Sequence, residues 1–66
     1  MRRSSETQKR KVRELLRDFR EAAGLRQIDL AARLTRPQSF VSKYESGEKT
    51  LAFLEVREVC RALGVS

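Results

Sequence analysis

Three polar side chains with hydrogen-bonding groups stand close together in the stretch TRPQSFVSKYESGEK: Gln38, Ser39 and Lys43. Val41 and Tyr44, three residues apart in the same stretch, have the spacing of the inner side of a short helix. On such a helix the amide, the hydroxyl and the ammonium group point outward in a fixed order. They supply donors and acceptors that suit recognition of a polar surface.

The composition argues against catalytic and metal chemistry. The chain has no histidine, and Cys60 is its single cysteine. A histidine-based acid, base or nucleophile relay is therefore excluded, and so is an internal disulfide bond. A zinc site would have to combine carboxylates with one thiolate, which is not the ligand set that zinc prefers. We therefore expect a protein that is not an enzyme, needs no cofactor or metal, and resides in the cytoplasm.

The net charge of +6 is concentrated at the start of the chain. Residues 1–13 carry six basic side chains and one acidic side chain, whereas residues 14–66 carry nine and eight, so the two parts contribute +5 and +1. A positive balance suits an anionic partner such as nucleic acid. The basic segment could add phosphate contacts. It could equally be the solvated face of an extended helix, because Arg10 with Glu14 and Arg17 with Glu21 form i,i+4 pairs of opposite charge.

The chain is expected to form one all-α domain, because its 66 residues suffice for a single domain and no segment alternates with a period of two. No apolar run is long enough to span a membrane, and the basic start MRRSSETQKRK lacks the apolar stretch of a secretory signal. We predict a basic arm over residues 1–5 and a domain over residues 6–66. The domain is predicted to be a compact bundle of four to five helices, of which four have clear signals: residues 6–23, 27–34, 37–45 and 52–63.

Helical spacing and capping residues define these helices. In the first helix a capping box joins Ser5 and Gln8, and Gly24 marks the end. Arg26 is expected to cap the second helix, with Leu25 and Leu30 in the positions of a hydrophobic staple, and Pro37 is expected to be the first residue of the third. The inward-facing side chains of the first and fourth helices are expected to be Val12, Leu15, Leu16, Phe19, Ala22 and Ala23, and Phe53, Val56, Val59, Cys60 and Leu63.

Two short helices joined by a tight turn are a known DNA-binding arrangement, in which the second helix lies in the major groove. Ala31 supplies the small residue that lets the two helices approach. Gln38 can form a bidentate bond with adenine, Lys43 can donate to guanine, and Ser39 can bond either a base edge or a phosphate. Phe40 points outward by simple helical counting, but we expect it to pack partly into the core.

The stretch REAAGLRQIDLAARLTRPQSFVSKYESGEKTL resembles the Xre family of bacterial and phage regulators, whose helix-turn-helix members include the lambdoid phage repressors and Cro proteins. The resemblance covers about residues 10–65. It rests on these residues in the family spacing: Arg20, Gly24-Leu25, Gln27, Leu30-Ala31, Leu34, the RPQS-x-VSK run, and Glu45 with Gly47. It implies a lambda-repressor-like DNA-binding fold.

The resemblance also implies roles for individual residues. Base contacts fall to Gln38, Ser39 and Lys43. Arg20 and Glu45 are expected to form a largely buried ion pair. Contacts with DNA phosphates are assigned to Gln27, Arg36, Ser42, Ser46 and Lys49. Thr35 occupies a turn position where the family often has glycine or asparagine, so a positive φ there would be strained.

The expected function is that of a sequence-specific transcriptional regulator, most simply a repressor, that binds a palindromic operator in double-stranded DNA as a homodimer. The homodimer could form only on DNA. The alternative is a helix-turn-helix module that binds another protein, for instance an antitoxin-like protein or an adaptor.

Overall fold

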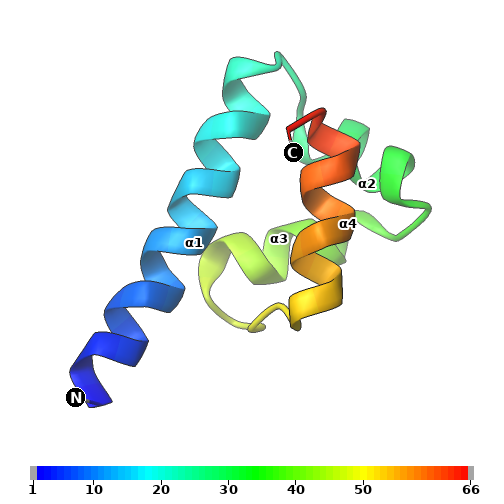
Figure 1. Cartoon of the computed structure of the whole chain (residues 1–66). Helices are drawn as coiled ribbons and strands as arrows, with labels where there is room; N and C mark the ends of the chain where they lie inside the picture. The colour runs from blue at the N-terminus through cyan, green and yellow to red at the C-terminus, as the bar shows by residue number, and fades with distance from the viewer. Residues whose placement is uncertain (1, 66) are drawn as a thin grey trace.

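The computed structural model describes residues 2–65, with side chains from residue 6 onward. It contains four helices in this part of the chain, α1 (Arg2–Ala22), α2 (Gln27–Leu34), α3 (Gln38–Ser46) and α4 (Phe53–Leu63), and no strand (Figure 1). The predicted all-α class is thus confirmed. The side chains of the predicted basic arm lie outside the described residues, as does the Ser5 side chain of the predicted capping box.

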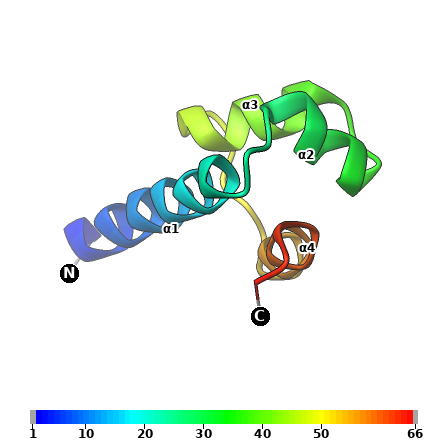
Figure 2. The same ribbon diagram turned by 90° about the horizontal axis from the view of Figure 1, so that it is seen from above.

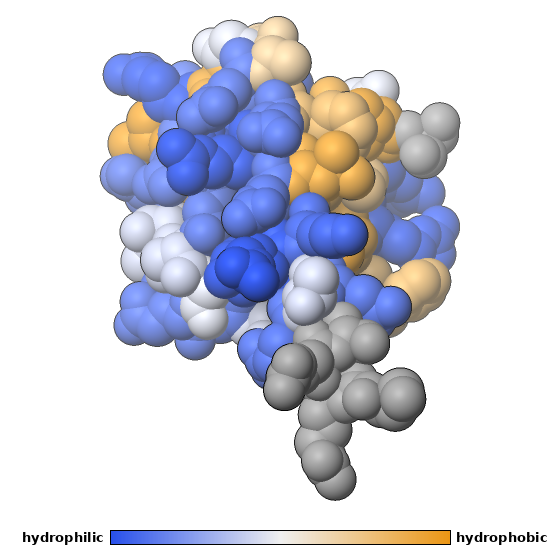
Figure 3. All heavy atoms as spheres, turned by 90° about the vertical axis from the view of Figure 1, so that its left-hand side faces the viewer, coloured by the Kyte–Doolittle hydropathy of each residue, from blue (hydrophilic) through white to orange (hydrophobic). Residues whose placement is uncertain are grey.

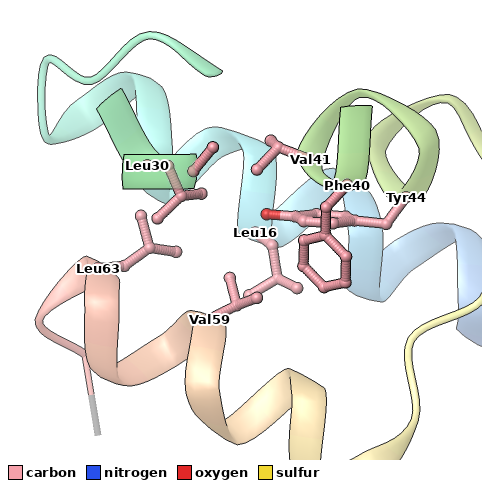
Figure 4. Close-up of a cluster of buried hydrophobic side chains, with 8 residues drawn as sticks. Leu16, Leu30, Phe40, Val41, Tyr44, Val59 and Leu63 are labelled. Atoms are coloured by element: carbon pink, nitrogen blue, oxygen red, sulfur yellow. The ribbon is translucent and has the colours of Figure 1, made fainter. Parts of the chain in front are cut away.

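The hydrophobic core lies between the α2–α3 pair and α4, and α1 covers one side of it (Figures 1 and 2). The fully buried side chains at its centre come from three helices: Leu30 from α2, Val41 and Tyr44 from α3, and Val59 from α4. Leu16 of α1 and Leu63 of α4 complete the contacts around them (Figure 4). Because α2 and α3 are each barely two turns long, their stability depends on this packing.

The buried side of α1 differs from the predicted one. Leu16 and Arg20 face the core, whereas Val12, Leu15 and Phe19 are exposed, with Leu15 as much as 52% accessible. Ala22 and Ala23 are exposed as well. The helical spacing was right, but the helix is rotated so that only one edge of its apolar stripe is buried. On the side of the molecule where α1 lies in Figure 1, hydrophobic residues form a patch beside a larger hydrophilic surface (Figure 3).

Most helix boundaries shift by one to four residues from the predicted ones. Both ends of α2 and the C-terminal end of α4 agree with the prediction. α1 begins at Arg2 rather than residue 6 and ends at Ala22 rather than residue 23. α3 begins at Gln38 because Pro37, in extended conformation, is its N-cap rather than its first residue, and α4 likewise begins one residue late because Ala52 is the cap. Phe53, the first residue of α4, lies outside the core and is 78% exposed, contrary to the prediction.

Side chains at the third helical position satisfy the start of two helices. The Arg26 amide donates to Asp29 Oδ2 at 2.8 Å, and the Ala52 amide donates to Glu55 Oε1 at 2.8 Å. Each carboxylate thus satisfies the amide of the N-cap residue, which is one half of a capping box. The Arg26 guanidinium also bonds Asp29 and, with this amide, lowers the pKa of Asp29 from 3.8 to about 2.

Candidate nucleic-acid interface

The turn between α2 and α3 is closed by backbone hydrogen bonds and a strained residue. The Thr35 amide donates to the Ala32 carbonyl at 3.1 Å, and the Arg36 amide donates to the Ala31 carbonyl at 3.0 Å. This closure requires the left-handed conformation at Thr35, whose φ is 58°. Only Thr35 among the non-glycine residues described has a positive φ. The strain anticipated from the sequence is therefore present, and it holds α2 and α3 at the short separation that a helix-turn-helix needs.

α3 has one buried side and one exposed side. Val41 and Tyr44 are fully buried, and Phe40 is nearly so, against the outward direction given by helical counting and in agreement with its expected packing. The exposed side chains include all three predicted base readers: Gln38, Ser39 and Lys43. Within residues 6–65, the side chains of these three have no hydrogen-bond or ion-pair partner, so their polar groups are available to an external partner.

An ion pair between α1 and the C-terminal end of α3 fixes the orientation of α3. Arg20 Nε donates to Glu45 Oε2 at 2.7 Å, and Nη2 donates to Oε1 at 3.0 Å. The remaining guanidinium nitrogen, Nη1, donates to the Leu25 carbonyl at 2.7 Å. The two side chains are 10% and 5% exposed, so the expected buried pair is present. The hydrogen bonds to Glu45 raise the pKa of Arg20, which remains charged.

Gln27, at the first position of α2, belongs to the same network. Its amide nitrogen, Nε2, donates to Glu45 Oε1 at 2.9 Å. The side chain is half-buried at the start of α2. Its position therefore depends on the buried ion pair, which links α1, α2 and α3 at the edge of the candidate interface.

The other predicted phosphate-binding side chains occupy different environments. Ser42 is exposed, and Ser46 is exposed with its hydroxyl donating to the Lys43 carbonyl at 3.0 Å. Lys49 lies 3.4 Å from Glu55 Oε1. The structure therefore places Ser42 and Ser46 on the exposed side of α3 and draws Lys49 toward α4.

Arg36 is held by α4 rather than presented with α3. Its guanidinium lies 3.1 Å from Glu58 Oε1 and 3.7 Å from Glu55 Oε2, and it stacks over the Phe40 ring at 4.4 Å. Lys49 approaches the same ring at 5.7 Å. Sequence reasoning missed this cluster because Phe40 and the acidic residues of α4 are distant in the chain. The available signal was the pair of acidic residues on one side of α4, Glu55 and Glu58.

Comparison with known proteins supports the same interpretation of the geometry. A family model described as a helix-turn-helix domain matches residues 12–66. A solved structure titled "XRE-family like protein from Pseudomonas syringae pv. tomato str. DC3000" is 42% identical, with a TM-score of 0.95 over 98% of this chain and 79% of that chain. The chain belongs to the Xre family of helix-turn-helix domains. A comparison with curated proteins finds no significant match.

Membership of the Xre family implies DNA binding and agrees with the exposed polar side of α3. None of the helices in the described residues is both long enough and apolar enough to cross a membrane. The same residues contain no cluster of histidine, cysteine, aspartate or glutamate that could hold a metal ion.

Proposed function

We propose that this Xre-family domain is a sequence-specific transcriptional regulator, in which α3 enters the major groove of DNA. The observation that carries the proposal is the exposed set Gln38, Ser39 and Lys43, whose side chains have no partner among residues 6–65, on a helix whose other side is buried. Gln38 would bond adenine and Lys43 would bond guanine, while Ser39 would bond a base edge or a phosphate. These residues lie in the N-terminal and central part of α3, which is the part that reaches base edges in helix-turn-helix proteins.

Phosphate contacts would come from the borders of α3. Gln27, Ser42 and Ser46 stand on helix surfaces next to the reading residues, and Lys49 follows in the turn. Arg36 would join them with the guanidinium donors that its pairing with Glu58 at 3.1 Å leaves free. Each such contact adds affinity without sequence preference, because phosphates are present at every position of the duplex.

We further propose that two copies bind a palindromic operator, with their α3 helices about 34 Å apart, one turn of the duplex. The start of α4 supports contact between two copies, since Phe53 and Leu54 are adjacent, apolar and 78% and 65% exposed. Occupation of a promoter by such a dimer would block transcription sterically, so repression is the simplest regulatory outcome.

Variants of single basic residues test the interface. Operator sequences are first selected from a random DNA pool, and their symmetry is scored. Lys43→Ala should weaken binding to the selected operator by about 1–3 kcal/mol and relax its preference at one base pair. Lys49→Ala should weaken binding to all sequences alike.

The control is Arg61→Ala, which removes an exposed positive charge from α4 and should leave binding unchanged. Thermal melting should be similar for all three variants, since each alters an exposed or half-exposed side chain. Unchanged operator affinity and base preference in Lys43→Ala would refute the assignment of α3 as the reading helix.

The exposed Phe53 and Leu54 also favour a second candidate function, a module that binds another protein, such as an antitoxin-like protein or an adaptor. Salt titration separates the two functions. DNA binding through several phosphates weakens steeply as salt rises, whereas binding through apolar contacts does not. Phe53→Asp should abolish cooperative binding to a palindrome and retain half-site binding if the domain acts as a dimer on DNA.

A further inference from the structure

A hollow of about 220 Å³ lies between the N-terminal half of α1, the turn that follows α3, and the start of α4. None of the proposed base-reading residues lines it. Its apolar surface comes from Val12 of α1, Leu51 of the turn and Val56 of α4, with the buried ring of Tyr44 behind them. Val12 is 42% exposed, and Leu51 and Val56 are each partly exposed, so an apolar group could displace water from this surface.

The edge of the hollow is positively charged. Lys9 and Arg13 project from successive turns of α1, and Lys49 projects from the turn after α3. Lys9 lies 4.0 Å from Glu6, and Lys49 lies 3.4 Å from Glu55, so each has a carboxylate nearby. Within residues 6–65, the Arg13 side chain has no hydrogen bond or ion pair.

The Arg13 guanidinium also contacts the end of α3. It lies against Gly47, where a Cβ atom would come within 3.0 Å of Arg13 Cζ. The absence of a side chain at Gly47 therefore lets the guanidinium rest on the backbone. The hollow thus combines an apolar surface with a half-buried guanidinium that has no ion-pair partner among residues 6–65.

We propose that this hollow binds a small organic anion with an apolar body, such as a medium-chain carboxylate, with its carboxylate on Arg13 and its chain on Val12, Leu51 and Val56. The guanidinium fork matches a carboxylate in a bidentate manner. A bare inorganic phosphate would leave the apolar surface unused, and a neutral apolar molecule would leave Arg13 unpaired. The amphipathic anion is the class of ligand that satisfies both features.

The test is isothermal titration of the full chain, without DNA, with octanoate and with octanol as the matched neutral probe. Octanoate should bind saturably and at least tenfold more tightly than octanol. Hexanoate and decanoate extend the series, and each methylene that enters the hollow should tighten binding roughly threefold to fourfold, until the hollow is full. Equal binding of the acid and the alcohol, or no saturation, would overturn the proposal.

Two variants connect the binding to the site. Arg13→Gln should weaken octanoate binding at least tenfold. The control Arg17→Gln removes an exposed charge one turn further along α1, outside the hollow, and should leave octanoate binding unchanged. Circular dichroism melting confirms that both variants fold. Equal losses in the two variants would show a non-specific charge effect and refute the site.

A second copy of the chain is the competing occupant. Analytical ultracentrifugation distinguishes it: dimerisation that Val12→Asp abolishes, together with no octanoate binding, would overturn the small-anion assignment. Because these measurements contain no DNA, their result is independent of whether α3 reads an operator.

Discussion

Truncation of Glu45 tests whether the buried ion pair organises the domain. Glu45→Ala removes both acceptors of the bidentate contact at 2.7 and 3.0 Å. The Arg20 guanidinium, whose side chain is 10% exposed, then keeps only the half-exposed Glu21 carboxylate, 3.9 Å away, as a counter-charge. One hydrogen bond remains for Arg20, to the Leu25 carbonyl. The amide of Gln27 also loses its partner, but water can replace that bond because the side chain is half-exposed.

The expected loss follows from the burial of the charge. Removal of one partner of a buried pair typically costs about 3–5 kcal/mol, and the retained bond to Leu25 places this variant near the lower end. A domain of this length has a free energy of unfolding of roughly 3–10 kcal/mol. A loss of about 3 kcal/mol should therefore lower the Tm by roughly 12–24 °C, and it leaves a free energy of unfolding of about 0–7 kcal/mol.

Urea unfolding followed by circular dichroism measures this loss. Arg17→Ala is the control, because it removes an ion pair whose side chains are 58% and 53% exposed and should cost less than about 0.5 kcal/mol. The double variant Arg20→Met with Glu45→Leu replaces both charges with apolar groups and should recover most of the stability. If Glu45→Ala costs no more than Arg17→Ala, or if the double variant is as unstable as Glu45→Ala, the reasoning is refuted.

Three further predictions concern single residues. Thr35→Gly should raise the free energy of unfolding by about 1 kcal/mol in urea titration, because glycine adopts the left-handed conformation (φ 58°) without strain. Tyr44→Phe should leave the free energy of unfolding unchanged or raise it by up to about 1–2 kcal/mol, because the buried Tyr44 hydroxyl has no partner among the described residues. Spectrophotometric titration of the wild type should show the pKa of Tyr44 raised to about 12 by burial. Arg26 lowers the pKa of Asp29 from 3.8 to about 2. The contribution of Asp29 to stability is therefore present above pH 3.8 and disappears as the pH falls to about 2. Asp29→Asn should flatten that part of the curve of stability against pH, and an unchanged curve would contradict the assignment.

Local signals in the sequence were sufficient to predict the helices and the helix-turn-helix. The bounds of α2 follow from Leu30, Ala31 and Leu34 at helical spacing, between an acidic residue in the first turn and a break at Thr35. Gly24 lies in the left-handed conformation just after α1, at the helix end that its position predicted. These features depend on residues within a few positions of each other, and such patterns are visible in one sequence.

Features that depend on distant partners were not predictable from local patterns. Arg36 was predicted to contact a DNA phosphate, and its pairing with Glu58 and stacking over the Phe40 ring were not anticipated. Phe53 was assigned to the core because it continues an apolar spacing, but the helix begins at this residue and turns it outward. In both cases the deciding factor is the position of α4 relative to α3, which helical spacing does not contain.

The rotation of α1 about its own axis is set by one long-range contact, the ion pair of Arg20 with Glu45, and this rotation decides which other residues of α1 face the core. The apolar spacing of α1 allows either Leu16 with Phe19 or Leu16 with Arg20 to face the core. Burial of the Arg20 guanidinium is possible because Glu45, 25 residues away, neutralises it in bidentate geometry.

Once Arg20 faces α3, the other positions on α1 follow from the 3.6-residue period. Arg13, seven residues earlier, falls on the same side and meets Gly47 at the end of α3, which places its charge at the hollow. Val12, Leu15 and Phe19 fall on the neighbouring side and are exposed. The buried ion pair, the placement of Arg13 beside Gly47 and the exposed apolar residues of α1 are therefore consequences of a single rotation of α1, set by a contact between α1 and α3.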